Sequence, residues 1–194
     1  MHHGRVASFL LGAWLAGSVL MWGIASQSLG VVDEAMSSPP AGAGKLIQAI
    51  GSDNARALLR YSAGEQNRFL FEWWEFVEMG LAVALILTLV LGLKSRLLAG
   101  LTTGMLLLVL FAHFRVTVEL AWLGRSIEFV HTAGEALERD QFWRLHTVYA
   151  AIEAVKLLLG AAVGILLFTM RRRRAAVRKE INVVDHANHG HVNR

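Results

Sequence analysis

Four long apolar segments constrain the fold of this chain more than any other feature of its sequence. They lie at residues 6–29, 76–93, 97–123 and 148–170. A helix needs ~20 apolar residues to cross the ~30 Å hydrocarbon core of a bilayer, and these segments have about that length. Charged residues make up only 18% of the chain, against ~25% in a typical soluble domain. The sequence therefore predicts an all-α fold: an integral membrane four-helix bundle, in a single domain over residues 1–175.

Basic residues predict the orientation of this bundle. Arg5 precedes the first segment, Lys94 and Arg96 lie in the very short connection between the second and third, and the run Arg171–Arg174 follows the fourth. By the positive-inside rule, both termini are expected in the cytoplasm. We therefore expect a multi-pass protein of the bacterial inner membrane, with Arg171–Arg174 contacting anionic lipid rather than nucleic acid. A cleaved signal peptide is an alternative for residues 6–29, but signal sequences have apolar stretches of only ~7–15 residues.

The connection between the first two segments predicts one or two short amphipathic helices in the first outer loop. Pro39 and Pro40 mark a turn, and apolar residues then recur with helical spacing from Leu46 to Tyr61. The second helix can continue through Gly64 into the second apolar segment. After the fourth segment, residues 176–194 are basic and then rich in histidine, which predicts a cytoplasmic tail without fixed structure.

Ionisable residues enter the apolar segments mainly at the ends expected to face outward. At ~1.5 Å rise per residue they lie in the same outer half of the bilayer. Arg115 and Glu119 are spaced i,i+4, and Glu153 and Lys156 are spaced i,i+3, so each pair can meet on one helix face. The predicted polar intramembrane site consists of Glu75, Glu78, His113, Arg115, Glu119, Glu153 and Lys156. Glu75 and Glu78 place two acids together, and this requires a basic partner from another helix.

Two interpretations of this polar site stay open. Intramembrane charges often mark ion or substrate pathways, which favours the handling of an ion or a small solute. Alternatively, the charges are structural ion pairs that hold the helices together. The sequence has no GxSxG, HExxH or P-loop motif, so no catalytic residue is predicted and a non-enzyme is favoured.

His113 and His146 are weak candidates for metal ligands. A haem held by two histidines needs them at matching depth, and His113 lies deeper than His146. No cofactor is therefore predicted, and a redox anchor that binds haem b or a quinone near His113 is one alternative function. Another is an accessory or assembly subunit, because small residues along the segments allow close helix packing in a homo-oligomer or a larger membrane complex.

The stretch ALLRYSAGEQNRFLFEWWE, residues 57–75, resembles a segment of bacterial four-helix membrane proteins related to transmembrane protein 205, which share a domain of unknown function. The matching residues are Arg60, Tyr61, Glu65, Asn67, Arg68, Phe71, Trp74 and Glu75. The stretches GAWLAGSVLMW and FWRLHTVYAAIEAVKLLLG are also similar, the latter through Phe142, Leu145 and His146. The resemblance covers residues 5–170. It implies four transmembrane helices in the inner membrane and brings no established activity. More distant haem-associated and copper-resistance relatives use a histidine in the first span, where residues 6–29 have none.

Overall fold

The computed structural model describes residues 2–127 and 135–192, with side chains described for 2–127 and 137–172. Every regular element in these ranges is a helix, which confirms the all-α class. In chain order the elements are α1 (His2–Ser37), α2 (Ala41–Ile50), α3 (Ser52–Leu87), η1 (Thr88–Leu93), α4 (Arg96–Phe111), η2 (Ala112–Thr117), α5 (Val118–Ile127) and α6 (Glu135–Val192). The elements η1 and η2 are π-helical turns that continue α3 and connect α4 with α5.

Four helical stretches in the described part of the chain are long and apolar enough to cross a membrane. They are His2–Ser37, Ser52–Leu93, Arg96–Ile127 and Leu137–Arg172, and each contains the whole of one predicted apolar segment. Each stretch is also longer than its apolar segment. Polar residues that favour helix extend it beyond the apolar part, so the predicted segments mark apolar character rather than helix ends.

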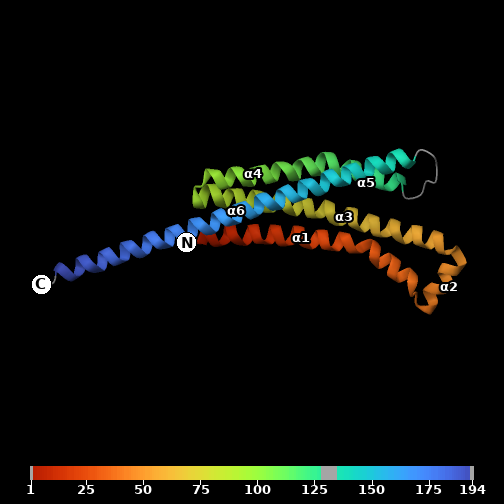
Figure 1. Cartoon of the computed structure of the whole chain (residues 1–194), viewed down its shortest axis with the longest axis horizontal. Coiled ribbons are helices and arrows are strands. Elements are labelled where there is room, and N and C mark those ends of the chain that lie inside the picture. The colour runs from red at the N-terminus through yellow and green to blue at the C-terminus, as the bar shows by residue number, and fades with distance from the viewer. Residues whose placement is uncertain (1, 128–134, 193–194) are drawn as a thin grey trace.

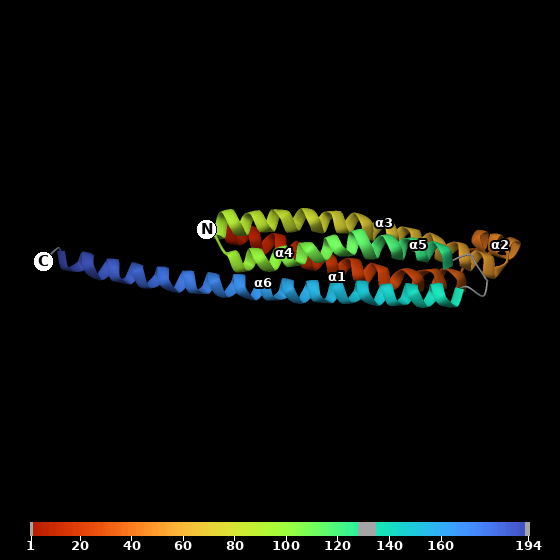
Figure 2. The same ribbon diagram turned by 90° about the horizontal axis from the view of Figure 1, so that it is seen from above.

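The long helices lie side by side (Figures 1 and 2). Helix α3 contacts α1 and α4, and α6 contacts α1, α4 and α5. The start of α1 and the start of α4 lie at one end, and α2 lies at the other (Figure 1). The last part of α6 projects beyond the other helices (Figure 2). It remains helical over residues 176–192, where the sequence predicted a tail without fixed structure.

Two local features set the connections between these helices. Lys94 adopts a left-handed conformation with φ 52°, and the next amide, Ser95 N–H, bonds to the Leu89 carbonyl, so the chain reverses within the short connection before α4. Between α2 and α3, Gly51 has φ 86°, a value that glycine adopts readily because it has no Cβ. Helix α3 then runs from Ser52 without a break into the apolar segment, as predicted for the second outer helix.

The helices bury apolar side chains against one another and leave many other large apolar side chains outside. The main core cluster joins α1, α3, η1, α4 and α6, and it includes Leu11, Trp14, Leu85, Met105 and Val163. Many leucine, valine and phenylalanine side chains on the outer faces are more than half exposed. The fully buried set nevertheless includes charged residues. Polar groups thus lie inside an apolar exterior.

Candidate functional site: a buried carboxylate and lysine network

Glu78 and Lys156 form the centre of a polar network inside the helices. Each side chain is 1% exposed, and the Lys156 ammonium lies 2.6 Å from both carboxylate oxygens of Glu78. From α1, the Trp14 indole N–H donates to Glu78 Oε1 at 2.8 Å and the Ser18 hydroxyl donates to the same atom at 2.9 Å. Glu78 therefore ties α1, α3 and α6 together.

Lys156 also contacts an acid on its own helix. Its ammonium lies 2.6 Å from Oε1 of Glu153, whose side chain is 23% exposed. This contact confirms the pairing that the i,i+3 spacing predicts. Lys156 is also the basic partner from another helix that Glu78 was expected to need. One ammonium is thus shared between two carboxylates.

Glu75, three residues before Glu78, has a different set of partners. It is also 1% exposed. The Thr117 hydroxyl donates to Oε1 at 2.5 Å, and Nδ1 of His113 lies 2.8 Å from Oε2. From α6, Tyr149 lies close to the same carboxylate. Glu75 therefore links α3 to the π-helical turn η2, three residues from Glu78 on the same helix.

The π-helical turn η2 positions the two side chains that hydrogen-bond to Glu75. His113 and Thr117 both lie in η2, and π-helical turns occur often at functional sites because they change which side chains face a neighbouring helix. The His113 ring makes edge-on contacts with Phe76 and Phe114, with ring centroids 4.9 Å apart in each case. These aromatic rings hold the imidazole beside Glu75.

The structure brings together five of the seven residues predicted for the polar site and leaves two outside it. The five are Glu75, Glu78, His113, Glu153 and Lys156. Arg115 and Glu119 are exposed, and among the described residues no ion pair joins them. Glu119 instead accepts a hydrogen bond from Gln141 at 3.3 Å. The i,i+4 rule assumes a regular α-helix, whereas Arg115 lies within η2.

Sequence reasoning missed four side chains of the network: Trp14, Ser18, Thr117 and Tyr149. Trp14 and Ser18 are spaced i,i+4 on the first apolar segment, as are His113 and Thr117 on the third. This repeated spacing of polar side chains was the available signal. It is weak, because tryptophan, serine and threonine are all common in apolar helices.

The first part of α3, which carries the matching residues of the stretch 57–75, is held to α1 and α5 by polar contacts. Asp33 lies 3.3 Å from Arg60, and Asn67 donates to the Ser28 hydroxyl at 2.7 Å. Glu65 lies 2.8 Å from Arg68 and 2.7 Å from Arg125. The hydrogen bond from Arg125, assisted by Arg68, lowers the pKa of Glu65 from 4.5 to about 2.

Trp74 and His146 have packing roles in the described structure. The Trp74 indole lies over Gly17 of α1, so closely that a Cβ at that glycine would overlap the ring. His146 is exposed and stacks on Phe142, with centroids 6.1 Å apart. Within the described ranges no three histidine, aspartate or glutamate side chains are placed to hold a metal ion. Among the described residues, His113 and His146 are thus not joined by further ligands of this kind.

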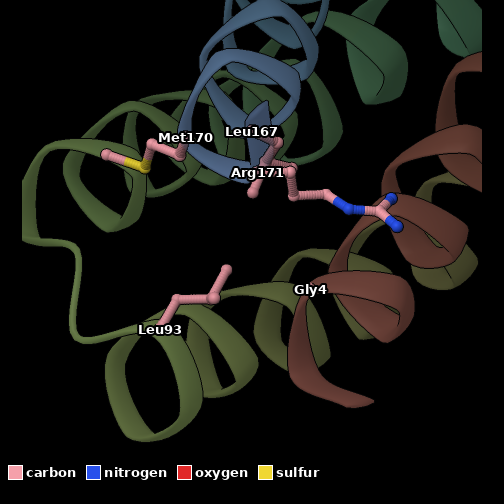
Figure 3. A pocket seen from close by; sticks show the side chains of 5 residues that line it. All are labelled: Gly4, Leu93, Leu167, Met170 and Arg171. Carbon is pink, nitrogen blue, oxygen red and sulfur yellow. The ribbon is translucent and has the colours of Figure 1, made fainter. Parts of the chain in front are cut away.

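A small cavity lies away from the network. It has a volume of about 20 Å³ and is lined by Gly4, Leu93, Leu167, Met170 and Arg171 (Figure 3). This volume is enough for about one water molecule. Gly4 precedes Trp14 by ~15 Å along α1, so the cavity does not reach Glu78.

Comparison of the chain with protein-family models, curated proteins and solved structures finds no match in any of the three.

Proposed function

We propose that this chain is an integral membrane protein whose helices cross the bilayer at the predicted segments 6–29, 76–93, 97–123 and 148–170. The apolar exterior supports this proposal, because soluble monomers seldom expose contiguous apolar patches larger than a few hundred Å². Trp73, Trp122 and Trp143 are 57–64% exposed, as expected for indoles at a membrane–water boundary.

The proposed location is the bacterial inner membrane, with both termini in the cytoplasm. The exposed bases Arg5, Lys94, Arg96 and Arg171 support this orientation, since they belong to the termini and the short connection expected on the cytoplasmic side. The run Arg171–Arg174 is the proposed contact for anionic lipid. Relation to the transmembrane protein 205 family stays a prediction from the sequence resemblance over residues 5–170.

The proposed activity is the handling of a small cation, such as a proton, at the buried network. The observation that carries it is the charge imbalance of that network. Glu75, Glu78 and Glu153 supply three carboxylates, whereas Lys156 is the one fixed cation among the described side chains that contact them. An uncompensated charge is costly in a low-dielectric interior. A cation or a proton must therefore offset the excess negative charge.

This imbalance favours ion handling over purely structural ion pairs. A structural pair needs one acid and one base, and Glu78 with Lys156 would suffice for that role. Glu75 adds a further buried carboxylate that contacts no lysine or arginine among the described residues. Maintaining such a group inside the helices is costly without a cation to bind.

A flux assay in reconstituted vesicles tests the proposed activity. The purified protein is placed in liposomes that contain a pH-sensitive dye, and gradients of H⁺, Na⁺ or K⁺ are imposed. We expect a gradient-driven change in internal pH with the wild-type chain and with Glu72→Gln, and its loss in Glu78→Gln. Glu72 is the matched control because it is exposed on the same helix. No flux with the wild-type protein, or equal flux with all variants, would contradict the proposal.

A second candidate, an accessory subunit or a homo-oligomer, is supported by one face of α4. Gly100 and Gly104 are spaced i,i+4, and no atom lies within 4 Å of a Cβ built at either position. Small residues at this spacing let a neighbouring helix approach closely. Purification in mild detergent with light scattering tests this candidate, and Gly104→Leu should reduce the mass of the particle if α4 forms the contact.

A further inference from the structure

We propose that Glu75, and not Glu78, is the residue of the network that takes up and releases a proton, and that His113 is the group through which the proton passes. This inference rests on the proposed function, namely that the network exchanges a cation with the outside. It then specifies the ion as a proton and assigns different roles to the two buried carboxylates. The hydrogen-bond partners of each carboxylate carry this distinction.

The partners of Glu78 match an ionised carboxylate. The Lys156 ammonium contacts both of its oxygens, and the Trp14 indole donates to one of them. Ammonium and indole N–H groups can donate hydrogen bonds but cannot accept them. A proton on Oε2 would therefore point at the ammonium, and a proton on Oε1 would have only the Ser18 hydroxyl, among the described side chains, to accept it. In either case the ammonium and the indole N–H would lose the negative charge to which they donate. Glu78 is thus a fixed negative charge that balances Lys156.

The partners of Glu75 match either protonation state. They are the imidazole of His113 and the hydroxyl of Thr117, and each of these groups can donate or accept a hydrogen bond. When Glu75 is ionised, the Nδ1–H of His113 donates to Oε2. When Glu75 is protonated, its Oε2–H donates to a bare Nδ1. The same contact serves both states.

The transfer is a simple exchange of N–H and O–H bonds. A proton from outside binds Nε2 of a neutral His113 and forms a new N–H bond. The Nδ1–H bond then breaks, and its proton crosses the 2.8 Å to Oε2 of Glu75. The ring is again neutral, with its hydrogen on Nε2, and the network has gained one positive charge. Release follows the same steps in reverse.

The groups around Glu75 are consistent with this assignment. The titratable groups that face it are Glu78 from α3, His113 from η2, and Tyr149 and Glu153 from α6. Helix α1 adds only Trp14 and Ser18, which contact Glu78. Lys156 is engaged with Glu78 and Glu153. A proton on Glu75 therefore neutralises a negative charge that Lys156 does not neutralise, because Lys156 is paired with Glu78 and Glu153.

Infrared difference spectroscopy of the protein in nanodiscs tests the assignment. Spectra are recorded in the wild-type chain, Glu75→Gln, Glu78→Gln and the exposed control Glu72→Gln over the pH range in which carboxyl and imidazole groups titrate. We expect Glu75→Gln to remove one band of a protonated carboxylic acid and Glu78→Gln to remove none. The carboxyl proton of the buried Glu75 should exchange with D₂O more slowly than that of the exposed Glu72, whose band is lost in Glu72→Gln. A carboxylic acid band that disappears in Glu78→Gln would overturn the proposal.

Two further variants complete the test. One keeps a carboxyl group at position 75, which controls for misfolding of Glu75→Gln, and the other tests the role of His113. Glu75→Asp keeps a carboxyl group, so it should shift the band rather than remove it. His113→Gln should slow the exchange of the Glu75 carboxyl proton with D₂O, seen as a slower shift of its band. An unchanged exchange rate would refute the role of His113. Flux that persists in Glu75→Gln would overturn this inference and leave the proposed function standing. Titration of Glu75 without any wild-type flux would support the inference and contradict transport.

Discussion

The ammonium of Lys156 lies 2.6 Å from each carboxylate oxygen of Glu78, although 78 positions separate the two residues in the chain. Each side chain is fully enclosed between α1, α3 and α6. Desolvating two charges is costly, so such a pair contributes little net stability, yet removing one partner leaves the other charge buried and uncompensated. The contact therefore makes the stability of the fold depend on the charge state of the network.

Lys156→Met should destabilise the protein strongly. By comparison with other buried pairs, loss of one partner costs about 3–5 kcal/mol, because the remaining carboxylate has no counter-charge. The double variant Lys156→Met/Glu78→Gln should recover much of this loss, since it removes both charges. Thermal unfolding in detergent, followed by circular dichroism, measures both effects.

The control for this experiment is Lys45→Met, because Lys45 is exposed. Its unfolding temperature should stay close to that of the wild-type protein. If the double variant is as unstable as Lys156→Met alone, the two side chains are not coupled in the way that the distances indicate.

Gly17→Ala should lower stability by about 1–3 kcal/mol, the usual cost of forcing extra volume into a packed interface. The added Cβ would overlap the Trp74 ring, which is rigid and must move as a whole. Gly12→Ala on the same helix is the matched control, because a Cβ there meets no atom within 4 Å. Thermal unfolding compares the two variants, and Trp74→Leu should rescue Gly17→Ala. Equal stability of both alanine variants would argue against the close α1–α3 contact.

The contribution of Glu65 to stability should fall in acid. Glu65 and Arg125 lie outside the proposed membrane segments, and the pKa of Glu65 is lowered from 4.5 to about 2. Above 4.5 the group is ionised in both folded and unfolded chains, so the contribution is complete. Below 4.5 the unfolded chain takes up a proton that the folded chain does not, and the contribution is lost as the pH approaches 2. Unfolding temperatures of wild type and Glu65→Gln should therefore converge over this range. A difference that does not vary with pH would refute the prediction.

Single introduced cysteines should report the orientation of the helices. Because the chain has no cysteine of its own, no other residue of the protein would react with the thiol label. Ser38, directly after α1, and Ser95, between η1 and α4, are suitable positions. A membrane-impermeant maleimide should label Ser38→Cys in intact cells and Ser95→Cys only after permeabilisation, because Lys94 and Arg96 favour the cytoplasmic side. Labelling of both variants in intact cells would contradict the proposed crossings.

Residue spacing predicted a contact correctly where the two residues lie on one regular α-helix. Glu153 and Lys156 meet as their i,i+3 spacing predicts, and helix α3 runs from Ser52 into the apolar segment as expected. The same kind of rule failed to join Arg115 and Glu119. A π-helical turn over Ala112–Thr117 intervenes, and its hydrogen-bond register could not be predicted from the residues of that stretch.

The sequence by itself determined the helical class, the four apolar stretches and the short connection at Lys94, because these depend on composition and on contacts close in the chain. Only the tertiary structure decided that Lys156 meets Glu78 while Glu75 contacts His113 and Thr117. The rotation of each helix about its axis selects these partners. That rotation is set by packing between segments far apart in sequence, such as the indole of Trp74 against Gly17, and no spacing within one segment encodes it.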